Sequence, residues 1–250
     1  MGSTMQKLPV NVTDRERLLF CIGGNVQNVD LSPHLVDEPF EQATPIRDFF
    51  SWPGKRNYEG LWWSSTTGTH VPFESLLERE YLLAADFDPS VIAIAAQPLA
   101  VLWPHGTPQS RSHTPDFFVR LANGDGLIVD VRHPDRVAPA AGQSELTQQL
   151  CDHIGWHYQV FTGLPTVLAG NLRWLSGYRH DRHSPSNRVC DALLSSFAVP
   201  APLRVGIHRA KITAAVDLNI LTSNVFHLLW RRTLQVDLKH VLSMESQVSA

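Results

Sequence analysis

Two aspartates are spaced so that local folding would bring their carboxylates together. Asp116 opens a short apolar run, and Asp130 lies near the end of the next one. Between the runs stands Asn-Gly-Asp-Gly (residues 123–126), and such residues tolerate positive φ and favour a tight β-hairpin. Pairing the two strands places both carboxylates at one end of the hairpin. The two charges repel each other unless a proton or a cation lies between them, so the spacing predicts a divalent metal site.

A third carboxylate is expected from the preceding helix. Residues 69–75 contain a proline and an early glutamate and predict a helix N-terminus, and the helix should end near residue 88. Glu74 and Glu78 would share a face of this helix, one turn apart. Glu78, with Glu74 as its rival, would join the two aspartates in supplying hard oxygen ligands, which suit Mg²⁺ or Mn²⁺.

A basic residue completes the pattern. Arg132 follows Asp130 by two positions, so both side chains would point to the same face of the strand. Its guanidinium could hold an attacked phosphate and stabilise the charge that develops on it. A metal ion would lower the pKa of a bound water and neutralise the leaving oxygen. The residue types therefore favour hydrolysis of phosphodiester bonds.

The elements around these residues predict an α/β fold. Residues 1–60 show little periodicity, so we expect an irregular segment that aromatic side chains pin to the core. After the first helix we expect, in order, strands at 91–96 and 100–103, the hairpin, a helix at 144–154, a buried strand at 156–162 and a helix at 164–178. This order is typical of helices packed on a mixed sheet.

The C-terminal quarter predicts a separate, mainly helical module. A stretch rich in Arg, His and Ser at residues 177–186 predicts a linker. Residues 222–224 would cap the last helix. After the linker we expect, in order, helices at 187–197, 207–218 and 225–232 and a strand at 233–238. This outline is typical of a winged helix-turn-helix domain.

The formal charge of −3 conceals an uneven distribution. Residues 1–172 carry 11 Lys and Arg against 19 Asp and Glu, whereas residues 173–250 carry 10 against 5. The basic part could meet phosphate backbones, or it could be a solvated face. No apolar run approaches the roughly 18 residues of a membrane helix, and three widely spaced cysteines predict free thiols. We therefore expect a cytoplasmic protein that binds no membrane.

Together the motifs resemble the PD-(D/E)XK nuclease superfamily and, within it, the TnsA-like endonuclease subunits of heteromeric, Tn7-type transposases. The likeness covers about residues 60–180. It is carried by residues 76–83 (LLEREYLL), Gln97-Pro98, 114–119 (TPDFFV), 129–132 (VDVR), 156–162 and 171–175. The resemblance implies a restriction-endonuclease-like mixed sheet flanked by helices. Its domains would be an irregular segment at 1–60, a nuclease domain at 61–176 and a winged-helix-like domain at 187–250.

The resemblance also implies the site and the activity. Glu78, Asp116 and Asp130 would be active-site acids and ligands of Mg²⁺, for which Mn²⁺ could substitute, and Arg132 would be the fourth catalytic residue. Glu74 would only face the helix dipole. The family activity is cleavage of DNA at the 5′ ends of a transposon. Its partners are a DDE-type transposase, which cuts the 3′ ends, and an AAA+ regulator, and it acts in the bacterial cytoplasm on the nucleoid.

One position departs from the family pattern, because Arg132 stands where the family typically has lysine. Lysine can lose a proton and act as a base, whereas arginine effectively cannot. Activation of water would then depend on the metal or on a nearby histidine, His113 or His133, and Arg132 would be a fixed electrostatic clamp. Contacts to DNA are expected from Lys55, Arg56, Arg111, His113 and His133.

Other interpretations remain open. A catalytically weakened or silent subunit would keep the fold and scaffold the other transposition proteins on DNA. Arg132 favours this interpretation, and the retention of three repelling carboxylates opposes it. A stand-alone restriction or repair nuclease would use the same site. Without the family pattern, Asp116 would be read as a turn cap, and Asp130 as an ion-pair partner of Arg132 or Arg120.

Overall fold

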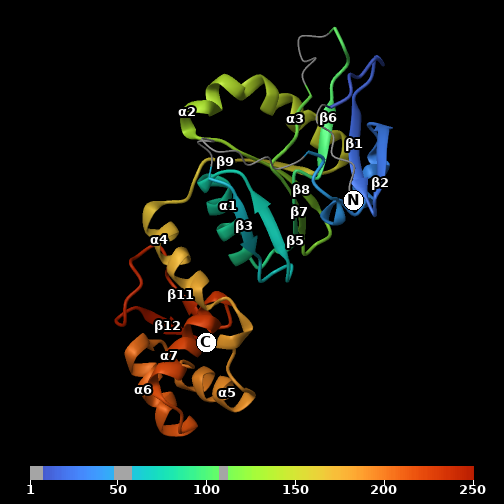
Figure 1. The fold of residues 1–250 in the computed structure, drawn as a ribbon. Helices are drawn as coiled ribbons and strands as arrows, with labels where there is room; N and C mark the ends of the chain where they lie inside the picture. Colours follow the sequence, from blue (N-terminus) through green and yellow to red (C-terminus); the bar gives the residue numbers. More distant parts are fainter. Residues whose placement is uncertain (1–7, 48–57, 107–111) are drawn as a thin grey trace. The chain divides into compact units, whose positions relative to one another are not determined.

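The structure, a computed structural model, describes residues 8–47, 58–106 and 112–250. The chain divides into an N-terminal unit, Met1–Leu82 with Asp88–Gly163, and a C-terminal unit, Leu83–Phe87 with Leu164–Ala250. Helix α4 (Thr166–Leu175) therefore belongs with the C-terminal helices, whereas the sequence predicts a nuclease domain that extends to residue 176. Strands and helices are interspersed along the chain (Figure 1), so the expected α/β class is confirmed.

The described part of the N-terminal unit contains three sheets. A mixed four-stranded sheet has the order β5-β7-β8-β9, with β8 and β9 parallel, and an antiparallel sheet has the order β2-β1-β6. Strands β3 and β4 form a two-stranded ribbon. The strands are β1 (Arg17–Ile22), β2 (Asn25–Asp30), β3 (Gly60–Trp63), β4 (His70–Phe73), β5 (Val91–Ala96), β6 (Leu99–Leu102), β7 (Phe117–Leu121), β8 (Gly126–Val131) and β9 (His157–Phe161). The helices are η1 (Pro33–Asp37), η2 (Phe40–Gln42), α1 (Leu76–Phe87), α2 (Pro134–Val137), η3 (Ala138–Ala140) and α3 (Ala141–Ile154).

Strand β7 carries aromatic side chains on both faces of the larger sheet. On one face Phe118 joins Trp156 and Phe40 in an apolar cluster that also contains residues of β1, β6 and α3. On the other face Phe117 stacks on Tyr81 of α1, with ring centroids 5.2 Å apart. Burying each such ring stabilises the fold by about 1.5–3 kcal/mol. The hairpin that carries both aspartates is therefore packed on both sides.

The expectation of an irregular segment at residues 1–60 is wrong for the β1–β2 hairpin. Leu18 and Phe20 face the main cluster and are fully buried, while Leu19 on the opposite face is 2% exposed. Because both faces of β1 are covered, the strand shows no alternation of apolar and polar residues. The signal by which a half-buried strand is recognised is therefore missing.

The first helix begins later than expected. Residues His70–Phe73 form β4, paired with β3, and α1 starts at Leu76. Ser75 precedes it as a cap, because its Oγ accepts a hydrogen bond from the amide of Glu78 at 3.1 Å. The expected end of the helix is confirmed at Phe87. The other strands and helices expected in this unit are present within a few residues, although β9 is only partly buried.

The described part of the C-terminal unit combines helices with a short antiparallel sheet of order β10-β12-β11. Gly206 allows close packing of α6 on α5, because a Cβ there would lie 2.1 Å from the ring of Phe197. Elements of this unit are α4 (Thr166–Leu175), η4 (Ser176–Tyr178), η5 (Asp181–His183), α5 (Asn187–Ser196), β10 (Ala201–Pro202), α6 (Leu203–Ala214), α7 (Leu218–Trp230), β11 (Gln235–Val236) and β12 (Gln247–Ser249). A helical module is therefore confirmed.

The last helix starts earlier than the sequence suggests. Asp217 caps α7, since its Oδ1 accepts from the amide of Asn219 at 2.8 Å, and the expected cap at residues 222–224 is wrong. Thr222 instead lies within the helix and bonds the carbonyl of Leu218. Among the described residues no single helix has both the length and the apolar character to cross a membrane. Helices α6 and α7 meet both criteria only when taken together, and the pair is bent by 119°.

We predict that Gly126→Ala destabilises the N-terminal unit by about 1–3 kcal/mol. A Cβ at this position would lie 2.7 Å from Trp156 Cδ1 and 2.9 Å from the ring of Phe118, both in the packed core. Chemical denaturation measures the free energy of unfolding. Gly142→Ala is the matched control, because a Cβ there meets nothing within 4 Å and alanine favours the helix by up to about 1 kcal/mol. Equal effects of the two substitutions would contradict this packing.

Candidate active site

Asp116 and Asp130 lie side by side at one end of the β7–β8 hairpin. Phe117 is paired with Val129 in the antiparallel register, so Asp116, which directly precedes β7, lies opposite Asp130. The amide of Val131 donates a hydrogen bond of 2.7 Å to Asp116 Oδ2. The hairpin thus forms where Asn-Gly-Asp-Gly predicts it and brings together the two carboxylates.

Asp116 holds its proton more tightly than an ordinary aspartate. Burial is the largest cause, and the negative charge of Glu78 and, more weakly, that of Asp130 act in the same direction, raising the pKa of Asp116 to about 8. The hydrogen bond from Val131 and the charge of Arg132 oppose this rise. At neutral pH Asp116 is therefore mostly protonated.

Asp130 is 1% exposed and has three partners. Tyr158 donates its hydroxyl to Oδ2 at 2.7 Å, and Arg132 Nη2 donates to the same oxygen at 3.1 Å. His113 Nε2 lies 3.0 Å from Oδ1 and 3.1 Å from Oδ2. Burial acts to raise the pKa of Asp130, but the interactions with His113, Tyr158 and Arg132 outweigh it and lower the pKa. Asp130 is therefore ionised at neutral pH.

Glu78 lies at the first turn of α1 and caps it. Its Oε2 accepts from the amide of Glu74 at 2.7 Å, and its Oε1 accepts from Ser75 Oγ at 2.8 Å. Burial raises the pKa of Glu78, and the two hydrogen bonds partly counteract the rise. Glu78 thus combines a capping role with an electrostatic influence on Asp116. Glu74, the rival candidate, forms an ion pair with Arg47 at 3.2 Å.

Arg132 joins the carboxylates to a basic concavity. Its Nη2 donates to Asp130 and also to Gln143 Oε1 of α3, at 3.3 Å. The same side chain lines a concavity of about 450 Å³ together with His133 and Arg136. As the sequence predicts, Arg132 therefore shares a face of the strand with Asp130.

The expected DNA contacts differ in where they lie. His113 is buried, and its ring is turned onto Asp130, so the structure places it beneath the site rather than at the surface. His133 is exposed and lies 3.4 Å from Asp135 as it caps α2. The remaining three, Lys55, Arg56 and Arg111, lie outside the described residues.

Two residues of the site were not foreseen. Tyr158 pairs with Ile128 in the parallel β8–β9 register, so it shares a face with Asp130, two residues farther along β8. Gln143 approaches from α3. Alternation along residues 156–162 contained a weak signal for Tyr158, but a parallel pairing across some thirty residues cannot be read from local sequence.

The three carboxylates do not form a ready metal cage in this arrangement. Within residues 8–47, 58–106 and 112–250, no group of three or more His, Cys, Asp or Glu side chains is positioned to hold a metal ion. The reason is visible in their partners, since Glu78 caps α1 and Asp130 is turned to Tyr158, His113 and Arg132.

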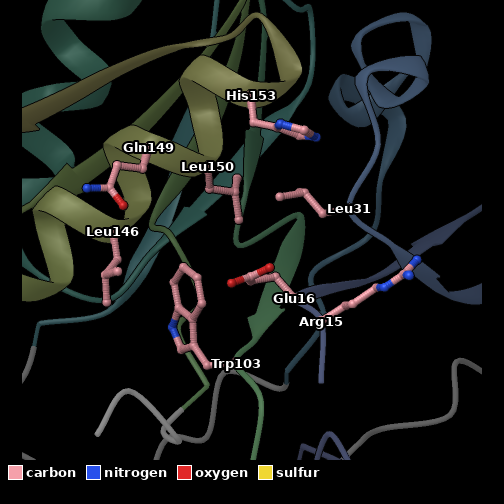
Figure 2. A pocket seen from close by; sticks show the side chains of 8 residues that line it. All are labelled: Arg15, Glu16, Leu31, Trp103, Leu146, Gln149, Leu150 and His153. Carbon is pink, nitrogen blue, oxygen red and sulfur yellow. The ribbon is translucent and has the colours of Figure 1, made fainter. Parts of the chain in front are cut away.

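A second concavity, of about 290 Å³, lies elsewhere in the N-terminal unit. Figure 2 shows that Leu146, Gln149, Leu150 and His153 of α3 line one side of it, and that Trp103, Leu31, Glu16 and Arg15 lie around the rest. The lining combines apolar with polar and charged side chains. None of the predicted catalytic residues lines it, so it is separate from the carboxylate site.

We predict that wild-type stability falls between about pH 4 and pH 8 relative to Asp116→Asn. The folded pKa of about 8 exceeds the ordinary 3.8, so the folded chain holds a proton that the unfolded chain has lost. This contribution is complete below the unfolded pKa and is lost as the pH rises through the folded one, by at most about 1.4 kcal/mol per pH unit. Denaturant midpoints across this range measure it. Parallel curves for the two proteins would contradict the prediction, and exposed Asp135→Asn serves as the control.

The comparisons with known proteins neither support nor oppose the resemblance seen in the sequence. The chain matches no protein-family model, and no curated protein matches it. A function must therefore be argued from the geometry and chemistry of the carboxylate site.

Proposed function

We propose that the chain is a metal-dependent endodeoxyribonuclease that hydrolyses DNA phosphodiesters. The observation that carries the proposal is the electrostatic coupling of three carboxylates, in which Glu78 and Asp130 both act on Asp116. They come from a helix and from both strands of one hairpin. Buried like charges cost folding free energy, and such perturbed groups occur preferentially at functional sites.

The donor chemistry suits a hard divalent cation, Mg²⁺ or Mn²⁺. All three groups offer carboxylate oxygens, and the buried Asp130 Oδ1 has the ring of His113 at 3.0 Å but no well-aligned hydrogen bond from a described residue. When bound, the cation would lower the pKa of a water molecule and neutralise the leaving oxygen. To become ligands, Asp116 must lose its proton and Glu78 must release Ser75.

The other side chains of the site would position Asp130 and bind the phosphate. Tyr158 and His113 fix the orientation of Asp130 through contacts of 2.7–3.1 Å. Arg132 carries a permanent charge beside the carboxylates and cannot take a proton from water. We assign it to holding the phosphate. Because His113 is engaged with Asp130, we assign it a positioning role rather than that of a general base.

A second candidate function is a catalytically silent, DNA-binding scaffold. The observation that favours it is that each carboxylate already has a structural partner. Glu78 caps α1, Asp116 accepts from Val131, and Asp130 accepts from Tyr158. Such a subunit needs no metal, so metal binding separates the two functions.

The resemblance to TnsA-like subunits extends the proposal to partners. A nuclease of this family would cut the 5′ ends of a transposon on the bacterial nucleoid. It would work with a DDE-type transposase, and an AAA+ regulator would bind its C-terminal part. The helices and short sheet of the C-terminal unit are compatible with a winged-helix-like module.

We predict that Mn²⁺ and Mg²⁺ raise the thermal stability of the wild type and have no such effect on Asp116→Asn. A ligand that binds only the folded chain stabilises it by about 2.7 kcal/mol at a concentration a hundred times its Kd. Asparagine keeps an oxygen to accept from Val131 but cannot lose a proton to become an anionic metal ligand. Melting curves and calorimetric titrations, each with and without a DNA duplex, measure the effect.

Asp135→Asn is the matched control, because it removes an exposed carboxylate outside the site and should respond to metal as the wild type does. No metal response in the wild type, even with DNA present, would overturn the nuclease and leave the scaffold. Where metal binds, cleavage of DNA by the chain alone would indicate a stand-alone nuclease. Cleavage only with partner subunits would support the transposase assignment.

A further inference from the structure

The concavity beside the carboxylates has the composition of an anion site. Its volume is about 450 Å³, and the side chains of Arg132, His133, Arg136 and Gln143 line it, with apolar walls from Val131 and Pro139. Among the described residues no aspartate or glutamate belongs to this lining, although Asp135 lies 3.4 Å from His133 Nδ1. The basic residues are unusual for their surroundings, because residues 1–172 carry 11 Lys and Arg against 19 Asp and Glu.

The hydrogen-bonding capacity of these residues is only partly used. Arg136 makes no ion pair or hydrogen bond with any described residue through its side chain. Arg132 uses Nη2 on Asp130 and Gln143, while its Nε is buried and has no partner within the described part of the chain. Gln143 accepts from Arg132 through its oxygen, which leaves its amide nitrogen to donate. Arg136 and the amide of Gln143 therefore offer unused donors to the concavity, and Arg132 adds positive charge to its wall.

We propose that this concavity binds a phosphate group of a DNA strand, next to the phosphodiester that the carboxylates cleave. The inference rests on the proposed nuclease function and adds a second phosphate position to it. Arg136 and His133 are its outer contacts, and Arg132 is the wall it shares with the carboxylates. Guanidinium groups suit phosphate because they bind two of its oxygens in one plane.

The position of Arg132 links the two phosphate positions. Its guanidinium lies 3.1 Å from Asp130 and also lines the concavity. A strand that places one phosphate at the carboxylates would therefore pass its neighbour along the same arginine. Its lining is dominated by cationic groups that suit a phosphate, and we assign the contact to positioning rather than to sequence recognition.

We predict that Arg136→Gln weakens binding of a short DNA duplex on the order of tenfold, in EDTA so that metal and cleavage play no part. Because one phosphate contact is lost, the slope of log affinity against log salt concentration should fall by about 0.9. Fluorescence anisotropy of a labelled duplex measures both quantities with the full chain. Inorganic phosphate should compete with the duplex in the wild type and lose that effect in the variant.

Arg15→Gln is the matched control. Arg15 is also exposed in the N-terminal unit and forms no ion pair within the described residues, but it lines the other concavity (Figure 2). Its substitution should change affinity by less than about twofold. Equal losses in the two variants would overturn the phosphate site, because they would report only a lost charge. Binding of inorganic phosphate at Arg136 without any binding of DNA would overturn the assignment to a nucleic acid.

The two proposals fail separately. The metal response of the wild type, measured on its own, reports the carboxylates. If it is absent while Arg136→Gln still weakens DNA binding, the nuclease is wrong and the phosphate site stands as part of a DNA-binding scaffold. If the metal response is present and Arg136→Gln binds DNA as the wild type does, the phosphate site is wrong and the nuclease stands.

Discussion

The carboxylate of Asp130 is buried and ionised. The arrangement of side chains at this end of the β5-β7-β8-β9 sheet depends on the partners that stabilise its charge. An uncompensated buried carboxylate costs several kcal/mol, so its partners must be held in place. Tyr158 comes from β9, His113 from the segment before β7 and Arg132 from the end of β8. Their contacts attach the parallel strand β9 to the hairpin, and Arg132 extends the network to Gln143 on α3.

The neighbouring aspartate shows what happens when such partners are fewer. Asp116 accepts one backbone hydrogen bond, from Val131, and faces the charges of Glu78 and Asp130. Two aspartates that lie opposite each other in one hairpin therefore have pKa values shifted in opposite directions. The pKa of Asp116 is raised and that of Asp130 is lowered, so Asp116 keeps its proton and Asp130 loses it. A proton on Asp116 relieves the repulsion in this arrangement. In the proposed function a divalent cation would relieve the same repulsion by displacing that proton.

Local signals predicted the parts of the site that depend on local structure. The turn at residues 123–126 places Asp116 opposite Asp130, and alternation along one strand places Arg132 on the same face as Asp130. Non-local contacts escaped prediction. Strand β1 is covered on both faces and shows no alternation, and Tyr158 reaches Asp130 through a parallel pairing that no local pattern encodes. One available signal was overlooked, since Ser-x-x-Glu ending at Glu78 marks a helix start by its capping pattern.

The contacts at position 132 suit an arginine better than a lysine. A lysine presents one point charge on a flexible stem, whereas a guanidinium offers five donors in a rigid plane. Arg132 uses one nitrogen to hold both Asp130 and Gln143, and it still borders the concavity that Arg136 shares. It therefore stabilises the buried carboxylate, attaches β8 to α3 and places positive charge at the border of the concavity. A lysine, with one ammonium group, could not combine these contacts in one plane.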